Sequence, residues 1–314
     1  MRVIFANSII SSIVQFLRRE KPIVNEKDLV SFINEIDSKH KVIDDDAISH
    51  LHKFYYKLPK HALSRDPFSE DYIKSQLQIY RDLSGTTGEY SCSNEITNHD
   101  FAPYRYNPFP YCTGSSKLVG EMLGSYGFAI KAMNLKPGSK IVEFGTGWGN
   151  ITYQLAMSGY NVTAVDVSPE LLRLLRERIE GHNGKAVFVQ SDMCEFAQSC
   201  TEEYDAALFT ESFHHCINHV ELIRQLSRIV PSGIIAFVRE PIFPAKNPYL
   251  PYPWGIRLDG QSVYFIRKLS WLELGYQYGY LKKLLLRFGW NLRRYDNPDK
   301  EVPCVYIARR KTRN

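Results

Sequence analysis

The chain has 314 residues, of which 44% are hydrophobic and 23% are charged, so it holds one large α/β domain with an appendage or two smaller domains. Its net charge of +5 is mild and its basic residues are scattered, which argues against nucleic acid as the main partner. The six cysteines include no Cys-x-x-Cys pair, so we expect reduced thiols in a cytoplasmic protein and no structural zinc.

The first 85 residues predict a helical appendage. Apolar patches broken by polar residues over 1–19 indicate an amphipathic helix that docks on the protein itself, with a partner or peripheral membrane contact as less favoured alternatives. This stretch is too short and too polar to span a bilayer. Further helices are expected over 26–36, 44–56 and 70–83, and no catalytic motif stands out among them.

Residues 86–114 are rich in Tyr, Pro, Asn and Gly, which indicates an irregular linker or a lid over a binding site. Tyr111 lies in this segment and is a candidate for substrate binding by stacking. A helix is expected from Ser116 to about 133, because Ser and Thr residues before it can cap its first turn. The domain that follows is predicted to occupy residues 115–314.

The centre of the sequence is the stretch from Lys140 to Asn150. Its apolar residues 141, 142 and 144 suit a short buried strand, and the helix that follows runs to about 157. Between them, Gly145, Gly147 and Gly149 turn the backbone sharply and let a ligand lie directly against the main chain. The spacing departs from the dinucleotide pattern Gly-x-Gly-x-x-Gly, because Asn150 stands where that pattern has its third glycine.

Four more strands alternate with helices, at about 161–165, 186–189, 206–210 and 234–238. This alternation predicts a parallel sheet with helices on both faces, whose ligands bind beyond the carboxyl ends of the strands. An acidic residue comes at or just after each of these ends: Asp166, Asp192, Glu211 and Glu240. We therefore expect a binding site along this edge of the sheet.

The remainder of the chain contains an insertion at about 241–268 that is rich in proline, a long helix over 272–288, and strands at 291–295 and 305–309 that close the sheet as a hairpin. The insertion carries Trp254 and Arg257, which are candidates for stacking on a sugar face and for recognising an anionic substrate group. Core packing and surface ion pairs are the alternative roles of these two residues.

The pattern Glu-x-Gly-x-Gly-x-Gly from Glu143 to Gly149 resembles motif I of class I S-adenosylmethionine-dependent methyltransferases. The resemblance covers about residue 115 to the end and implies a Rossmann-like, seven-stranded, mostly parallel sheet whose seventh strand is antiparallel. Pro-Ser-Gly at 231–233 departs slightly from the family's Pro-Gly-Gly. The resemblance implies that S-adenosylmethionine is bound by Glu143, Gly145, Thr146, Gly147, Gly149, Asp166, Val167, Asp192, Met193 and Glu211. A helix or turn cap is the alternative role of Asp192.

Transfer of a methyl group to a hydroxyl calls for a base that removes the proton. His214 and His215 follow the fourth strand of the domain, and histidine titrates near neutral pH, so we expect one of them to be the base, oriented by Glu211 or Glu240. Alternatively, one histidine caps the next helix and the other packs against Phe213. These four residues also make a divalent metal conceivable, but histidine is a poor magnesium ligand and a metal is not expected.

Weaker local similarity to methyltransferases of bacterial polysaccharide biosynthesis lies in Phe-His-His-Cys at 213–216 and in residues 253–260. It implies a sugar or glycan acceptor, with a small phenolic or carboxylate metabolite as the alternative. Two other classes stay open: an NAD-linked oxidoreductase, which Glu143 and Asn150 disfavour, and a non-catalytic module that binds the cofactor. The sequence does not determine the oligomeric state.

Overall fold

The structure is a computed structural model that describes residues 20–41, 45–59, 66–96, 100–182, 184–299 and 302–310. The helix expected over 1–19 lies outside these residues. The chain forms two compact units. The first contains the described residues up to Tyr90 together with Lys246–Glu273, and the second contains Ser91–Ala245 and the chain from Leu274 onward. None of the described helices combines the length and the apolar character needed to cross a membrane.

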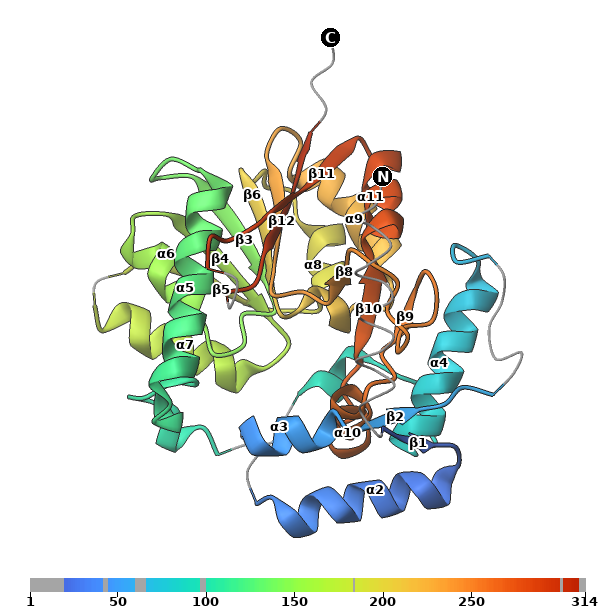
Figure 1. Cartoon of the computed structure of the whole chain (residues 1–314). Coiled ribbons are helices and arrows are strands. Elements are labelled where there is room, and N and C mark those ends of the chain that lie inside the picture. The colour runs from blue at the N-terminus through green and yellow to red at the C-terminus, as the bar shows by residue number, and fades with distance from the viewer. Residues whose placement is uncertain are drawn as a thin grey trace. The chain divides into compact units, whose positions relative to one another are not determined.

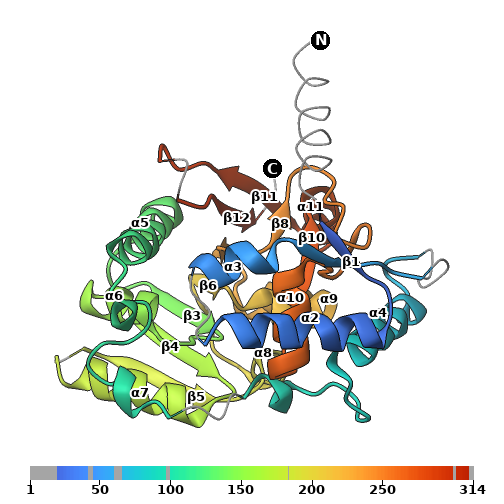
Figure 2. The same ribbon diagram turned by 60° about the horizontal axis from the view of Figure 1, so that its bottom comes forward.

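The first unit is mainly helical (Figure 2). Side-chain caps begin three of its helices, since Asn25 accepts a hydrogen bond from the backbone of Asp28, Ser69 accepts one from Tyr72 and Asp259 accepts one from Ser262. Gly85, in the left-handed conformation, ends one of them. Its elements are β1 (Lys21–Ile23), α2 (Glu26–Lys39), α3 (Asp45–Leu51), β2 (Phe54–Tyr56), α4 (Glu70–Ser84), β9 (Trp254–Ile256) and α10 (Gly260–Leu269). Helix α10 packs against α3 and α4, so the insertion and the N-terminal helices share one core.

Two predicted helices were wrong in part. The helix expected over 44–56 ends at Leu51, because the aromatic run Phe54–Tyr56 pairs in parallel with β1 as strand β2. The helix expected over 272–288 begins only at residue 278. Its first part is β10 (Leu274–Gln277), which pairs in parallel with β8 (Ile242–Phe243), and α11 (Tyr278–Arg287) follows.

The second unit is built on a seven-stranded sheet (Figure 1). Its strands are β3 (Lys140–Phe144), β4 (Asn161–Asp166), β5 (Ala186–Gln190), β6 (Ala206–Thr210), β7 (Ile234–Val238), β11 (Trp290–Tyr295) and β12 (Val305–Arg310). They lie in the order β11-β12-β7-β6-β3-β4-β5, and β12 runs antiparallel to both of its neighbours while β3 to β7 are parallel. The predicted α/β sheet with an antiparallel strand from the C-terminal hairpin is confirmed.

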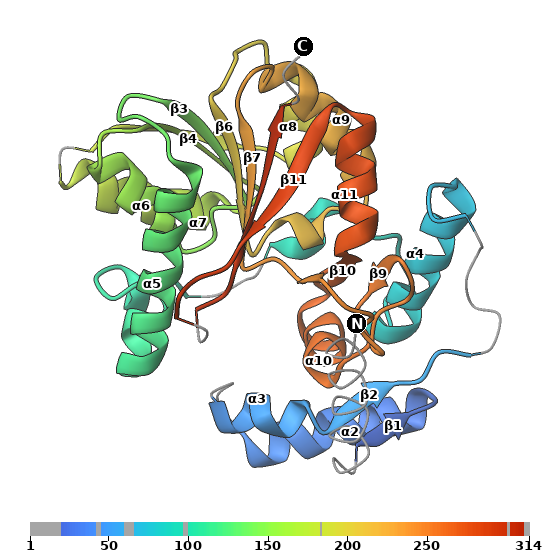
Figure 3. The ribbon, with the colours of Figure 1, turned by 45° about the horizontal axis from the view of Figure 1, so that its top comes forward.

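Helices cover both faces of this sheet, with α5, α6 and α7 on one side and α8, α9 and α11 on the other (Figure 3). They span α5 (Ser116–Met133), α6 (Asn150–Met157), α7 (Pro169–Glu180), α8 (Met193–Ser199) and α9 (His219–Ile229). Apolar residues of α5 and α6 pack on β3, β4, β6, β7 and β12 in one core. Three short 3-10 helices, η1 (Cys92–Glu95), η2 (Ala102–Tyr104) and η3 (Tyr111–Thr113), occupy the segment before α5.

The strand order reverses at β3. The chain passes from β3 to β4 and β5 in one direction, and β6 and β7 then lie on the other side of β3. Such a reversal leaves a crevice beyond the carboxyl ends of the strands, because the loops on its two sides turn away from each other. We therefore expect a ligand-binding site among the residues that follow β3, β4, β6 and β7.

Candidate functional site

The glycine turn after β3 adopts backbone conformations that favour glycine, with φ of 66° at Gly145, 50° at Gly147 and 66° at Gly149. Two of these glycines are also enclosed. A Cβ atom added to Gly145 would lie 2.5 Å from the Cβ of Ser212, and one added to Gly149 would lie 2.4 Å from the Cδ1 of Leu175. A Cβ at Gly147 would meet nothing within 4 Å. Gly147 is therefore the glycine whose open side can face a ligand.

Asp166, at the end of β4, holds this turn in place. Its Oδ2 accepts hydrogen bonds from the backbone N–H of Gly147 at 3.0 Å and from the hydroxyl of Thr146 at 3.3 Å. Its Oδ1 accepts one from the backbone of Ser168 at 2.9 Å. Burial raises the pKa of this carboxyl and the hydrogen bonds oppose that rise. The sequence predicted Asp166 as a ribose ligand but did not indicate that its carboxyl group also holds the glycine turn.

Glu143 is the fourth of the five residues of strand β3, just before the glycine turn, and its side chain is fully buried. Its Oε2 accepts a hydrogen bond from the hydroxyl of Thr152 on α6 at 2.6 Å, and no hydrogen-bond partner meets its Oε1. Burial raises the pKa of Glu143 to about 8, and the hydrogen bond from Thr152 opposes this rise. A buried polar atom without a partner is costly, and this one fits a site completed by a ligand or by water.

Trp148, within the glycine turn, is surrounded by aromatic side chains from the segment before α5. The ring centroids of Phe101, Tyr104 and Phe109 lie 5.6, 4.8 and 5.9 Å from its own. Arg178 of α7 donates a hydrogen bond to the carbonyl oxygen of Trp148 at 2.6 Å. Phe101, Tyr104 and Phe109 thus pack on the turn, and a lid role for this segment stays a prediction. No local sequence pattern indicated Trp148 as the contact.

Asp192 caps α8, as the alternative role predicted. Its Oδ1 accepts hydrogen bonds from the backbone N–H groups of Cys194 at 2.7 Å and Glu195 at 3.2 Å. The other carboxylate oxygen takes no part in this cap. Met193 is the first residue of α8 and Val167 directly follows Asp166, so both predicted cofactor residues lie after the carboxyl ends of strands. A role toward adenine stays a prediction for Asp192 and Met193.

Glu240, after β7, organises the loop that follows β6. Its Oε1 accepts hydrogen bonds from the backbone of Ser212 at 2.7 Å and of Phe213 at 2.9 Å. Its Oε2 lies 2.8 Å from the Nδ1 of His214 and accepts a further bond from the backbone of that residue at 3.2 Å. Burial raises the pKa of Glu240 to about 7, and these donors oppose the rise. The carboxylate therefore fixes both the backbone and the ring of His214.

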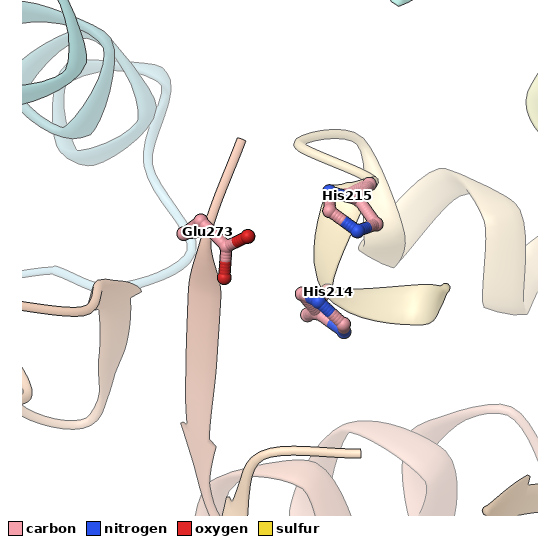
Figure 4. A group of neighbouring side chains, drawn as sticks. All are labelled: His214, His215 and Glu273. Atoms are coloured by element: carbon pink, nitrogen blue, oxygen red, sulfur yellow. The ribbon is translucent and has the colours of Figure 1, made fainter. Parts of the chain in front are cut away.

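His214 and His215 lie in the short helix η4 (Phe213–His215), and their ring centroids are 4.1 Å apart (Figure 4). The Nδ1 of His215 lies 3.1 Å from the Oε2 of Glu95, which belongs to η1. Two carboxylate–histidine pairs thus stand side by side. The sequence analysis did not single out Glu95, because nothing in its local sequence distinguishes it from other glutamates.

Glu211 does not approach His214 but faces Arg239, with its Oε1 3.1 Å from the Nε of the guanidinium. Both residues adopt left-handed backbone conformations, with φ of 52° at Glu211 and 57° at Arg239, at the ends of the neighbouring strands β6 and β7. Such strain in a residue other than glycine is concentrated at functional sites. Arg239 also donates to the hydroxyl of Ser125 on α5 at 3.4 Å.

Of the three predicted substrate residues, Trp254 and Arg257 belong to the first unit and Tyr111 belongs to the second. Trp254 is fully buried in the first unit, where its Nε1 donates to the carbonyl oxygen of Pro67 at 2.8 Å and its ring packs on Tyr72. It therefore has the core-packing role, and stacking on a sugar is not available to its ring. Arg257 forms an ion pair with Glu273 in the same unit. Tyr111 opens η3 in the second unit and is partly exposed, so it stays a candidate.

Comparison with known proteins supports the resemblance. Residues 141–233 match a family model described as a methyltransferase domain. The chain is 29% identical over 102 residues to an uncharacterized methyltransferase of Bacillus velezensis, covering 32% of this chain and 46% of that protein. It is 25% identical over 155 residues to a tuberculostearic acid methyltransferase of Mycobacterium tuberculosis, covering 46% of this chain and 33% of the relative.

Among solved structures, a putative methyltransferase of Haloferax volcanii in complex with an activator has a TM-score of 0.48 and 12% identity, covering 62% of this chain and 92% of the other. A didemethyltoxoflavin methyltransferase of Burkholderia thailandensis has a TM-score of 0.44 and 18% identity, covering 68% and 86% of the two chains. The chain spans about half or less of the length of the two curated relatives named above.

Proposed function

We propose that this protein transfers a methyl group from S-adenosylmethionine to a hydroxyl group of a sugar or glycan intermediate. The observation that carries the proposal is the glycine turn, which contains the open Gly147 and directly follows the strand that holds Glu143, a buried carboxyl with an unpartnered oxygen. The methyltransferase domain matched over residues 141–233 supports the same cofactor.

The residues around the turn fit the parts of this cofactor. Asp166 is proposed to accept hydrogen bonds from the ribose hydroxyls, because it ends β4 and its carboxyl group also holds the glycine turn. Glu143 brings no positive charge to the turn, and S-adenosylmethionine, which lacks phosphate groups, needs none there. Asp192 and Met193 are proposed to contact the adenine, and Glu211 is proposed to line the site at the end of β6.

His214 is proposed as the base. The Nδ1 of His214 lies 2.8 Å from the Oε2 of Glu240, and a neutral ring with its proton on Nδ1 carries on Nε2 the lone pair that can accept a proton. The sulfonium methyl group of the bound cofactor is electrophilic and needs only an aligned nucleophile. As the acceptor oxygen bonds to the methyl carbon, the carbon–sulfur bond would break and S-adenosylhomocysteine would leave. His214 would take the proton of the acceptor hydroxyl, and Glu240 would stabilise the imidazolium that results.

His215, held by Glu95, is proposed to orient the acceptor rather than to take its proton. Tyr111 and Arg239 are proposed to line the acceptor side, because both lie in the second unit and their neighbours include Tyr126 of α5. A polyhydroxylated acceptor suits this mixture of histidines, tyrosine and ion pair. The alternative acceptor is a small phenolic or carboxylate metabolite.

The test is transfer of a labelled methyl group from S-adenosylmethionine to a panel of nucleotide sugars and glycans, with small phenols and carboxylic acids alongside. We expect label in a sugar hydroxyl and a loss of at least a hundredfold in His214→Gln, the usual contribution of a base. His52→Gln is the matched control, because His52 is exposed in the first unit. Label in phenols alone would contradict the proposal of a sugar or glycan acceptor. Unchanged turnover in His214→Gln would contradict the proposal that His214 is the base.

A further inference from the structure

Cys194 and Cys216 bring their sulfur atoms within 3.5 Å of each other. Both are free thiols in the second unit, on segments that border the candidate site. Cys194 is the second residue of α8, and Cys216 directly follows His215 at the end of η4. We propose that these two cysteines form a reversible disulfide and constitute a redox modification site that connects the two segments.

The geometry needs only a small rearrangement. A disulfide bond is about 2.05 Å long, so the two sulfur atoms must approach by roughly 1.5 Å. Rotation of the side chains and a slight shift of η4 or of the first turn of α8 can supply this movement. Helices α8 and α9, which flank the pair, pack directly on each other and keep the two segments adjacent.

Accessibility decides which thiol reacts first. Cys216 is 5% exposed, whereas Cys194 is partly exposed, so a small oxidant reaches Cys194. A hydrogen bond with Cys194 and burial raise the pKa of Cys216 well above that of an ordinary thiol, which also makes it the slower nucleophile. Cys194 is therefore the attacking residue and Cys216 the resolving one.

The oxidant is a low-molecular-weight disulfide such as oxidised glutathione. The Cys194 thiolate attacks one sulfur of the oxidant, the disulfide bond of the oxidant breaks, and one small thiol leaves while a mixed disulfide forms on Cys194. Cys216 then loses its proton to solvent and attacks the Cys194 sulfur, and the second small thiol leaves. The two cysteines lose two electrons and two protons in total, and the oxidant becomes two thiols.

The bond joins the turn that carries His214 and His215 to the helix that begins at Met193. A shift of about 1 Å in catalytic groups can slow a reaction about a hundredfold. Oxidation is therefore expected to lower turnover at least tenfold, and reduction with dithiothreitol is expected to restore it. This consequence rests on the proposed function, whereas formation of the bond does not.

The experiment treats the full chain with oxidised glutathione at graded ratios to reduced glutathione, blocks free thiols, and maps the cysteine peptides by mass spectrometry. Peptide mapping is required because Cys112 is exposed and can form a mixed disulfide of its own. We expect a Cys194–Cys216 cross-link that dithiothreitol removes. In Cys216→Ser a mixed disulfide should remain on Cys194, and the control Cys200→Ser should still form the cross-link.

A mixed disulfide that persists on Cys194 in the unchanged chain, or a bond from Cys194 to Cys92, would overturn the inference. Finding both Cys194 and Cys216 unmodified under conditions that modify Cys112 would also overturn the inference. A cross-link in a protein without methyl transfer would contradict the proposed function alone. If the reduced protein transfers methyl groups but oxidised glutathione produces no Cys194–Cys216 cross-link, this inference alone is contradicted.

Discussion

Replacing Glu240 with Gln tests the link between structure and catalysis most sharply. The glutamine side chain has one acceptor oxygen where the carboxylate has two. If this oxygen keeps the hydrogen bonds from the backbones of Ser212 and Phe213, the NH2 group must face the backbone N–H and the Nδ1 of His214. The imidazole must then place its proton on Nε2, and the atom proposed to accept the acceptor's proton becomes a donor. We expect turnover to fall between a hundredfold and ten-thousandfold.

The effect on folding stability follows from the same contacts. Hydrogen bonds to a charged group contribute about 1.5–3 kcal/mol each, and Glu240→Gln forfeits two of them. Removing a buried charge offsets part of this loss, since burial already raises the pKa of Glu240 to about 7. A net destabilisation of about 1–3 kcal/mol is expected, which urea unfolding resolves.

Three measurements separate the possible outcomes. Turnover is measured with the acceptor that the panel identifies, and affinity for S-adenosylhomocysteine by calorimetry, which should change by less than about threefold, ~0.65 kcal/mol. Nitrogen-15 NMR of the His214 ring reports the tautomer directly. Glu221→Gln is the matched control, because Glu221 is a half-exposed partner of Arg224 on α9. Turnover within threefold of the unchanged protein in Glu240→Gln would refute the base assignment.

Two further predictions concern the turn and a buried histidine. Gly147→Ala should weaken S-adenosylhomocysteine binding at least tenfold. Gly138→Ala is the control and should not weaken it, because Gly138 also has a positive φ and open space around it but lies before β3. Equal effects of the two substitutions would contradict the placement of the ligand. Burial lowers the pKa of His219 to about 4, below the 6.5 of the unfolded chain, so stability is lost as pH falls through this window. Lowering the pH from 7.5 to 5 should cost about 2 kcal/mol more in the unchanged protein than in His219→Gln, measured by urea unfolding; an equal cost would contradict a buried neutral ring.

The regular elements of the second unit were predictable because their signals are local. Strand β3 combines a run of apolar residues with glycines that end it, and Ser168 and Pro169 mark the first turn of α7. Strands β2 and β10 were missed for the opposite reason. Each is three or four residues long and exists because a distant segment pairs with it, which no local pattern records.

The same distinction holds at the candidate site. The position of Glu240 after a strand suggested that it orients a histidine. Its Oε2 lies 2.8 Å from the Nδ1 of His214, and its part in catalysis stays a prediction. Contacts between segments far apart in the chain escaped prediction, such as Glu95 with His215 and Phe101 with Trp148. Trp254 was misassigned because an aromatic residue in a proline-rich insertion gives the same pattern whether it is buried or exposed.

The central claim is that the glycine turn binds S-adenosylmethionine, and calorimetric titration of the full chain with S-adenosylhomocysteine, with NAD in parallel, tests it most directly. The account predicts micromolar binding of S-adenosylhomocysteine, no binding of NAD, and loss of the first signal in Asp166→Ala. Binding of NAD alone, or undiminished binding of S-adenosylhomocysteine in Asp166→Ala, would contradict it.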